Sequence, residues 1–448
     1  MTTSTNKNIR LRRALGSALI STCAAITPAV AQPGSVVFPN TAGLMETKGK
    51  IDTQNAFFRD LGTNGRSCST CHQFSDGMSV TPEHIQLRFR LSAGADPIFR
   101  LVDGANCDNL DVTSFAARQS AYSLLLSKGL IRVAIDVPSD AEFTVIAVDN
   151  PYGCSSHTTL SLYRRPLPAT NLRFLSGVMW DGRESLPGKT LLENLERQAN
   201  NAIVGHAQGA PLSDDLQEEI ARFEMGLHTA QLVDASAGVL SISGATGGPE
   251  ALSLQPFFIG INDPLGQNPT GAAFNPSAFT LFTAWLEEID SRRQSIARGE
   301  RIFNSRPILI TGVAGLNDAL GLPSTPGTCT TCHDSPNVGH HSVPLAIDIG
   351  INDVSGRTPD LPVFTLQRKG SLEVKRTLDP GRALITGKWG DIGKTKGPIL
   401  RGLAARAPYF HNGSAATLLD VVNFYDSRFS LGLTAEQKND LVRFLSAL

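Results

Sequence analysis

The chain has little that would attach it to a membrane or to nucleic acid. In its 448 residues no run of about 18 apolar residues follows the N-terminal segment, which excludes an internal membrane-spanning helix. Its 40 lysine and arginine residues balance 41 aspartate and glutamate residues, and a formal net charge of −1 favours neither nucleic acid nor an anionic membrane surface. With 41% hydrophobic residues the chain is typical of globular proteins, and its length favours two domains.

Methionine is scarce and unevenly distributed. The chain has five methionines, and none follows Met225. A metal site in the C-terminal half therefore cannot take a thioether ligand from that half. The same half does contain His411 and, fourteen residues later, Tyr425.

The N-terminus has the order of features of an export signal. Basic residues end at Arg13, an apolar run covers residues 14–26, and Ala29-Val30-Ala31 offers a cleavage site. This order predicts a signal peptide over residues 1–31 and a mature protein in a bacterial periplasm.

The seven cysteines fall into separate groups. Cys23 lies in the predicted signal peptide, and four others form two C-x-x-C pairs. Cys107 and Cys154 remain, and in an oxidising compartment we expect them to form a disulfide. Two buried free thiols are the alternative.

Both C-x-x-C pairs are followed directly by histidine, in Cys68-Ser69-Thr70-Cys71-His72 and in Cys329-Thr330-Thr331-Cys332-His333. C-x-x-C-H is the attachment pattern of c-type haem: the cysteines bind the two vinyl groups, and the histidine gives its imidazole to the iron. A single four-cysteine zinc site is a poor alternative, because about 260 residues separate the pairs, whereas zinc ribbons space them by about 15–20. A thioredoxin-like pair would need a βαβ context. We therefore predict two covalently bound haem c groups, with His72 and His333 as iron ligands.

Short helical segments, residues 55–58 and 298–304, precede the two attachment sites and form a weak internal repeat. Helical periodicity also marks residues 212–229 and 276–298. We therefore expect a mainly α fold of two cytochrome c-like helical domains.

The first of these domains should cover residues 32–285 and the second residues 286–448. Within the first, residues 130–135 and 142–148 alternate as strands do, and 158–163 is a third candidate. These strands predict a small β-containing insertion at about 86–165.

Four features of the chain occur in a fixed order. They are the first C-x-x-C-H, Met179-Trp180-Asp181-Gly182-Arg183, the second C-x-x-C-H, and Lys396-Gly397-Pro398-Ile399-Leu400-Arg401 leading into Ala407-Pro408-Tyr409-Phe410-His411-Asn412-Gly413. In this order the chain resembles the bacterial di-haem cytochrome c peroxidases and their relative MauG, over most of the mature chain outside the β region. The resemblance implies that the first haem is the peroxide site, that the second is six-coordinate, and that Trp180 lies between them; a core aromatic is the alternative for Trp180.

The resemblance also implies distal groups at the first haem. Gln198 matches the family's distal glutamine. The glutamate that the family usually has about ten residues later is Gln208 here, which cannot exchange a proton at neutral pH. His206 could move the proton instead, or could be a loop histidine. His84 could close the first haem, as a distal histidine does in some family members.

At the second haem, Tyr425 stands where the peroxidases have a methionine ligand and where MauG has tyrosine. We expect Tyr425 to be the sixth iron ligand; a core aromatic residue is the alternative. His340 and His341 are the rival ligands, although they are too close to His333 in sequence to reach the opposite face of the ring easily. His411 is expected to have a supporting role.

Family members also hold a calcium ion between their domains, partly by backbone oxygens at the positions of Arg406 and Pro408. The family's asparagine ligand has no counterpart here, since Arg165 falls near its position. One calcium ion is thus an expectation from the resemblance alone.

Three functions stay open. The resemblance and Tyr425 favour a MauG-like periplasmic oxidoreductase that uses hydrogen peroxide to oxidise a donor or partner protein. The first alternative is a cytochrome c peroxidase that removes hydrogen peroxide with electrons from a small cytochrome c or cupredoxin. The second is a non-enzymatic di-haem electron carrier, which would need strong ligands on both faces of both irons.

Overall fold

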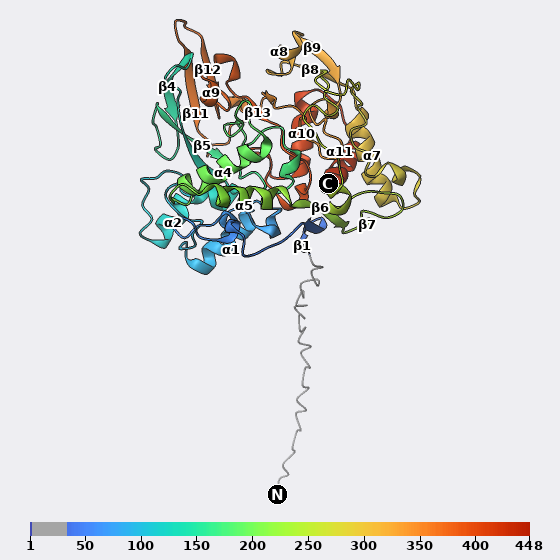
Figure 1. Cartoon of the computed structure of the whole chain (residues 1–448), viewed down its shortest axis with the longest axis horizontal. Coiled ribbons are helices and arrows are strands. Elements are labelled where there is room, and N and C mark those ends of the chain that lie inside the picture. Colours follow the sequence, from blue (N-terminus) through green and yellow to red (C-terminus); the bar gives the residue numbers. More distant parts are fainter. Residues whose placement is uncertain (2–33) are drawn as a thin grey trace.

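A computed structural model describes Met1 and residues 34–448 (Figure 1). Apart from Met1, the predicted signal peptide over residues 1–31 lies outside the described residues. Helices make up 31% of the structure and strands 16%. The expectation of a mainly α, cytochrome c-like fold is therefore wrong. Helical periodicity is confined to a few segments of the chain, and many of the remaining segments pair as short strands.

The helices are mostly short. They are α1 (Pro82–Ser92), α2 (Phe115–Ala121), α3 (Ser123–Lys128), α4 (Leu191–Gly205), α5 (Asp214–Met225), α6 (Pro249–Ser253), α7 (Ser291–Ser305), α8 (Asn317–Leu320), α9 (Ala383–Thr386), α10 (Leu418–Arg428) and α11 (Ala435–Ser446). Five of them (α4, α5, α7, α10 and α11) contribute side chains to two cavities.

Within residues 34–448 the strands form five small sheets, in the orders β1-β2-β6-β7, β12-β11-β4, β3-β5, β8-β9 and β10-β13, and every pairing is antiparallel. The strands are β1 (Ser35–Asn40), β2 (Gly43–Lys48), β3 (Ile131–Asp136), β4 (Phe143–Asp149), β5 (Thr159–Arg164), β6 (His228–Asp234), β7 (Gly238–Val239), β8 (Ile308–Thr311), β9 (Ser324–Gly327), β10 (Ala346–Ile347), β11 (Val363–Arg368), β12 (Val374–Thr377) and β13 (Thr395–Lys396).

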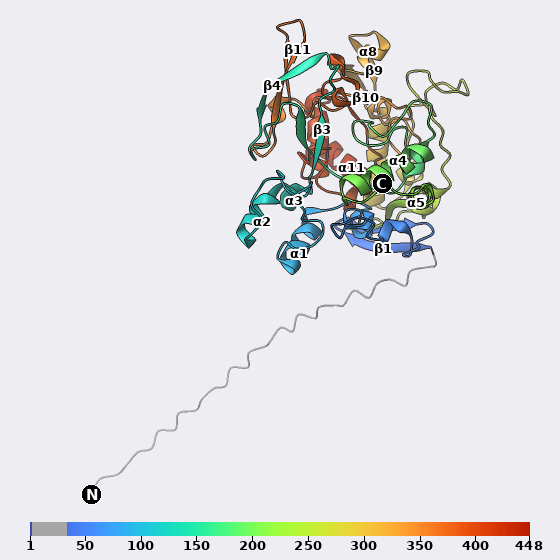
Figure 2. The same cartoon turned by 60° about the vertical axis from the view of Figure 1, so that its left-hand side comes forward.

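The three strands expected at 130–163 are present, but they do not form one sheet. β3 pairs with β5, whereas β4 pairs with β11, far away in the sequence. In both views β4 lies beside β11 (Figures 1 and 2). Phe143 of β4 and Phe364 of β11 are both buried in one small core, which explains the pairing. Alternation along a strand predicts which face is buried but does not identify the partner strand.

The two longer helical predictions had different outcomes. α5 covers most of 212–229, with Ser213 at its N-cap. In contrast, α7 begins only at Ser291, where the Asp290 side chain accepts a hydrogen bond from the backbone N–H of Arg292 at 2.9 Å. The preceding residues are largely irregular, because Phe279, Phe282 and Trp285 fill the core instead of one helix face.

The largest core lies around α7, α10 and α11. α7 and α11 approach each other closely at Gly299, where a Cβ would lie 2.0 Å from the carbonyl oxygen of Asp440. Glycine at position 299 therefore permits the close packing of α7 against α11. In the described part of the chain, no helix is long and apolar enough to cross a membrane.

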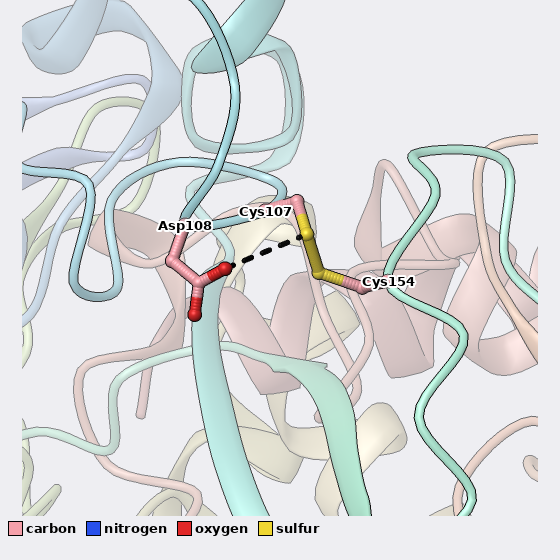
Figure 3. A group of neighbouring side chains, drawn as sticks. All are labelled: Cys107, Asp108 and Cys154. Carbon is pink, nitrogen blue, oxygen red and sulfur yellow. Dashed lines mark hydrogen bonds between the residues drawn. A yellow bond between two sulfur atoms is a disulfide. The ribbon is translucent and has the colours of Figure 1, made fainter.

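The structure contains a disulfide between Cys107 and Cys154, with the two Cα atoms 5.8 Å apart. Figure 3 shows the carboxylate of Asp108 beside Cys107, with 3.9 Å between Asp108 Oδ1 and the sulfur. Both sulfurs are bonded to each other, so this group is a covalent cross-link and offers no thiolate to a metal. The bridge connects the segment before α2 to the loop after β4.

Candidate active site

The two C-x-x-C-H segments have the same local structure. Each pair begins a single 3₁₀ turn, Cys68–Thr70 in one case and Cys329–Thr331 in the other. The backbone N–H of Ser67 donates to Thr70 Oγ1 at 3.0 Å, and that of Thr328 donates to Thr331 Oγ1 at 3.0 Å. A threonine two residues before the histidine therefore stabilises both turns.

Both histidines are held by the same kind of hydrogen bond. Nδ1 of His72 donates to the carbonyl oxygen of Met78 at 3.0 Å, and Nδ1 of His333 donates to that of Gly339 at 2.7 Å. A carbonyl oxygen only accepts, so the proton is on Nδ1 and the lone pair of Nε2 is left for a metal. In each case the acceptor lies six residues after the histidine and has a left-handed backbone, with φ of +59° and +80°.

The helical segments before the attachment sites also make matching contacts. The ring of Phe57 lies 6.4 Å from that of His72, and Phe303 of α7 lies 5.8 Å from His333. The weak repeat in the sequence thus corresponds to a repeated packing of phenylalanine on histidine.

His72 lies in the wall of a cavity of about 1110 Å³, counting space open to solvent; we call it the first cavity. The predicted catalytic side chains Trp180, Gln198 and His206 line the same cavity. Gln198 and His206 come from α4 and its C-cap, so one helix brings both to the first cavity.

His206 is half-exposed, and its Nδ1 donates to Oδ2 of Asp103 at 2.6 Å. Asp103 is buried and also pairs with Arg66 at 2.5 Å. Burial opposes ionisation of Asp103, but the hydrogen bond from His206 and the charge of Arg66 hold its pKa below the usual value. His206 is therefore oriented by a carboxylate, with Nε2 left as its second proton site. Gln208 is exposed.

His84 does not line the first cavity. It lies on α1, and its Nδ1 contacts Oδ1 of the buried Asp76. His84 could reach a haem iron at the first cavity only if its contact with Asp76 were broken.

His333 lies in the wall of a larger cavity of about 1430 Å³, again counting space open to solvent; we call it the second cavity. Cys329, Cys332 and Tyr425 line the second cavity as well. Tyr425 lies in the middle of α10, and burial, followed by the nearby Cys332 and Cys329, raises the pKa of its phenol. The hydroxyl is therefore neutral unless a cation binds to it.

Trp180 lines both cavities. Its indole Nε1 donates to the carbonyl oxygen of Arg165 at 2.8 Å, which fixes the ring.

Lys396 also lines both cavities and donates from Nζ to the carbonyl oxygen of Gly177 at 2.7 Å. Burial lowers the pKa of Lys396 to about 7. Sequence reasoning used Lys396 only as part of a motif and did not assign it a role.

His411 is buried in the wall of the second cavity, with Nε2 3.8 Å from Oδ2 of Asp379. Asp379 accepts two hydrogen bonds from Arg164, at 2.7 and 2.9 Å, and Arg164 also pairs with Asp181 of the W-D-G segment. Burial lowers the pKa of His411 to about 4, so its ring is neutral at pH 7. This network connects the W-D-G segment to the segment around His411.

Glu224 of α5 is a second group that sequence reasoning missed. It is buried in the wall of the first cavity, and its Oε2 has no hydrogen-bond partner among residues 34–448. Burial raises its pKa to about 8. Nothing in the sequence distinguishes Glu224 from the exposed acidic residues of α5, because only packing against neighbouring elements buries it.

His340 and His341, the two alternatives to Tyr425 as a predicted iron ligand, are both buried. His341 lines the second cavity, and its Nδ1 lies 2.9 Å from Oδ2 of Asp334. His340 is not part of that lining and packs against Phe257, with ring centroids 5.3 Å apart.

The residues expected around a calcium ion do not fit one. The guanidinium of Arg165 donates to the carbonyl oxygens of Lys128 at 2.9 Å, Val80 at 2.7 Å and Arg406 at 3.1 Å. Burial, then the charge of Arg406, lowers the pKa of Arg165 to about 10, so it stays protonated at pH 7. The positively charged guanidinium of Arg165 already binds these carbonyl oxygens. It would also repel a calcium ion placed beside them.

The remaining residues do fit two haem groups. The two C-x-x-C pairs lie at different cavities, with Cys71 lining the first and Cys329 and Cys332 the second, which excludes one shared four-cysteine site. All four cysteines are free thiols in the described chain. Each cavity also has a histidine whose Nε2 is left for a metal.

No family model matches the chain. Over 140 residues the chain is 31% identical to the cytochrome-c peroxidase IdrP1 of Pseudomonas sp. (strain SCT). The aligned segment covers 27% of this chain and 36% of that protein. It is also 31% identical over 133 residues to the cytochrome-c peroxidase IdrP2 of Denitromonas iodatirespirans, with the same coverage. The match thus spans about a third of the length of these curated relatives.

A solved MauG-like protein associated with microbial copper homeostasis aligns with 88% of this chain and 86% of its own, at 16% identity. The TM-score of this alignment is 0.40. At a coarse level, then, the chain is similar to proteins named cytochrome-c peroxidase over a limited segment of their length.

Proposed function

We propose that the protein is a di-haem peroxidase-type oxidoreductase that uses hydrogen peroxide to oxidise a donor or partner protein, in the manner of MauG. Residues 32–285 would carry haem 1 at the first cavity, and residues 286–448 haem 2 at the second. When bound, the haem groups supply the redox chemistry with hydrogen peroxide. The holding residues are Cys68, Cys71 and His72 for haem 1, and Cys329, Cys332 and His333 for haem 2.

The observation that carries the proposal is the position of Trp180 in the walls of both cavities. Each cavity also contains one histidine whose ring is fixed by a backbone carbonyl. An indole shared by two redox sites provides a short path for electrons between them. A peroxidase site with such a path can use the second site to share oxidising equivalents.

At the first cavity, the chain's own residues would handle the peroxide and its proton. Gln198 can donate and accept hydrogen bonds and would orient the peroxide. His206 would move a proton at Nε2, since Asp103 holds its Nδ1. His206 would thereby take over the proton transfer that a glutamate carries out in the family, because this chain has Gln208 at the glutamate's position.

At the second cavity, Tyr425 would be the sixth ligand to the iron. A phenolate oxygen is a hard donor that stabilises the oxidised metal more than a thioether does. This favours keeping oxidising equivalents on the protein over accepting electrons from a high-potential carrier.

A conventional cytochrome c peroxidase is the second candidate, because the curated relatives carry that name. It would take electrons from a small cytochrome c or cupredoxin. For either function we propose a periplasmic protein, and the Cys107–Cys154 disulfide supports an oxidising compartment.

One equivalent of hydrogen peroxide, added to the oxidised holoprotein without a donor, tests the proposal by stopped-flow absorption. We expect a spectral change at both haems that persists long after mixing. In Trp180→Phe the change at the second haem should be at least about tenfold slower. This corresponds to an activation barrier higher by about 1.4 kcal/mol. Trp389→Phe changes a tryptophan that lines neither cavity, so it is the matched control and should behave as wild type.

Prompt bleaching with no persistent change would contradict the MauG-like function. Rapid oxidation of reduced cytochrome c by peroxide, with no such persistence, would favour the second candidate instead.

A further inference from the structure

A buried group of metal-binding side chains lies next to the second C-x-x-C-H segment but does not include its histidine, His333. It consists of Asp263, Asp334 and His341, which are 1%, 0% and 3% exposed. One ligand atom from each lies within 4.8 Å of the others. Asp334 directly follows His333 in the chain, whereas Asp263 comes from the loop after α6.

The two loops are already held in position by other bonds. The side-chain amide of Asn262 donates to the carbonyl oxygen of Asp334 at 3.0 Å. The backbone N–H of Gly260 donates to the carbonyl oxygen of Ser342 at 3.0 Å. The three side chains therefore meet on a preorganised scaffold, which is what a metal site needs.

Each carboxylate uses one oxygen for the backbone and keeps the other free. Asp263 Oδ2 accepts from the N–H of Gln267 at 2.7 Å, and Asp334 Oδ1 accepts from that of Ser342 at 2.7 Å. Asp263 Oδ1, Asp334 Oδ2 and both ring nitrogens of His341 have no hydrogen-bond partner among the described residues. Buried carboxylates in this condition are costly unless a cation compensates them.

The separation of two of these atoms agrees with a shared metal. His341 Nδ1 lies 2.9 Å from Asp334 Oδ2, yet the two are not aligned as a hydrogen bond. Two ligand atoms in adjacent positions of an octahedral site, each about 2.1 Å from the ion, are about 3.0 Å apart. A simple ion pair between His341 and Asp334 would leave Oδ1 of Asp263 unexplained.

We propose that Asp263, Asp334 and His341 bind one divalent first-row cation, Zn²⁺ or Mn²⁺, separate from the haem irons. Two carboxylates and one imidazole suit these ions, whereas Ca²⁺ takes six or more oxygen ligands. The two carboxylates together carry a charge of −2, which one divalent cation cancels and a single protonated histidine does not. The bound ion would connect the loop after α6 to the segment that follows the second C-x-x-C-H.

The test uses untagged holoprotein that has been treated with chelator and then dialysed against Zn²⁺ or Mn²⁺. Elemental analysis counts zinc or manganese per chain, separately from haem iron. We expect one equivalent in wild type and at least about a tenfold weaker affinity in Asp263→Asn and in His341→Gln. His340→Gln changes the adjacent buried histidine, which is outside the group, and should bind like wild type.

A second measurement keeps the test decisive if a variant folds poorly. Zn²⁺ added to chelator-treated wild type should raise the unfolding temperature and saturate at one equivalent. The proposal is overturned if wild type binds neither ion, or if Asp263→Asn and His341→Gln retain wild-type affinity.

Discussion

The indole of Trp180 and the imidazole of His411 meet edge to face, with ring centroids 5.9 Å apart, in the wall of the second cavity. Trp180 Nε1 donates to the carbonyl oxygen of Arg165, and the backbone N–H of Arg165 donates to the carbonyl oxygen of His411 at 2.6 Å. The three residues form a closed set of contacts. The W-D-G segment and the segment 407–413 are therefore held together at the place where the two cavities meet.

Tyr425→Phe removes the phenol oxygen proposed to bind the second haem iron. We expect resting-state EPR to lose the low-spin signal of the second haem, with the signal of the first haem unchanged. Tyr409→Phe is the control, because Tyr409 lines the same cavity but its hydroxyl donates to the carbonyl oxygen of Leu403 at 3.1 Å. An unchanged spectrum in Tyr425→Phe would make Tyr425 a core aromatic residue.

Asp379→Asn removes a charge from the buried network of Arg164, Asp181 and His411. Arg164 then has one carboxylate fewer in a buried site, and the free energy of unfolding should fall by about 3–5 kcal/mol. Denaturant titration measures the change. Glu218→Gln breaks an exposed pair with Arg222 on α5 and should cost less than about 1 kcal/mol. Equal losses in both variants would show that the network does not stabilise the fold.

Arg165→Asn replaces the hydrogen-bonded guanidinium with asparagine. Asparagine is the calcium ligand near this position in the family that the sequence resembles. Calcium added to wild type should not change its unfolding temperature, because Arg165 already donates to the carbonyl oxygens of Val80 and Arg406. The variant should be less stable by about 2 kcal/mol or more, since buried acceptors lose their donors. Part of that loss should return with millimolar calcium. A calcium-dependent rise in wild type would refute the role of Arg165.

Glu224→Gln tests the buried carboxyl at the first cavity. Its pKa is raised by burial from 4.5 to about 8, so the folded state binds this proton more tightly than the unfolded state. Wild-type stability should therefore be fully retained below about pH 4.5 and should fall as the pH rises toward 8, by up to about 5 kcal/mol.

The Gln variant cannot ionise and should lack that part of the fall. Urea titrations between pH 5 and 8 measure the difference, and Glu218→Gln on the same helix should follow the wild-type curve. Parallel curves for wild type and Glu224→Gln would show that Glu224 is not buried in the native protein.

Local patterns in the sequence determined much of the candidate site. The two C-x-x-C-H segments and the strand positions at 130–163 follow from residues close together in the chain, whereas the distal candidates rested on the resemblance to a family. A tight turn needs only its own residues, so Cys68–Thr70 and Cys329–Thr331 adopt the same turn in two different surroundings.

Only the tertiary structure decided the fold class and the remaining groups at the site. β4 pairs with β11 because their phenylalanines share one core, a relation between segments that no local periodicity contains. Burial depends on packing in the same way: it makes Glu224 an unpartnered carboxyl and brings Asp263 to His341. The Arg165 guanidinium likewise binds the carbonyl oxygens of Lys128, Val80 and Arg406 because packing brings three distant segments to it. The sequence alone therefore specifies the residues that we propose to attach haem, whereas long-range packing determines what surrounds them.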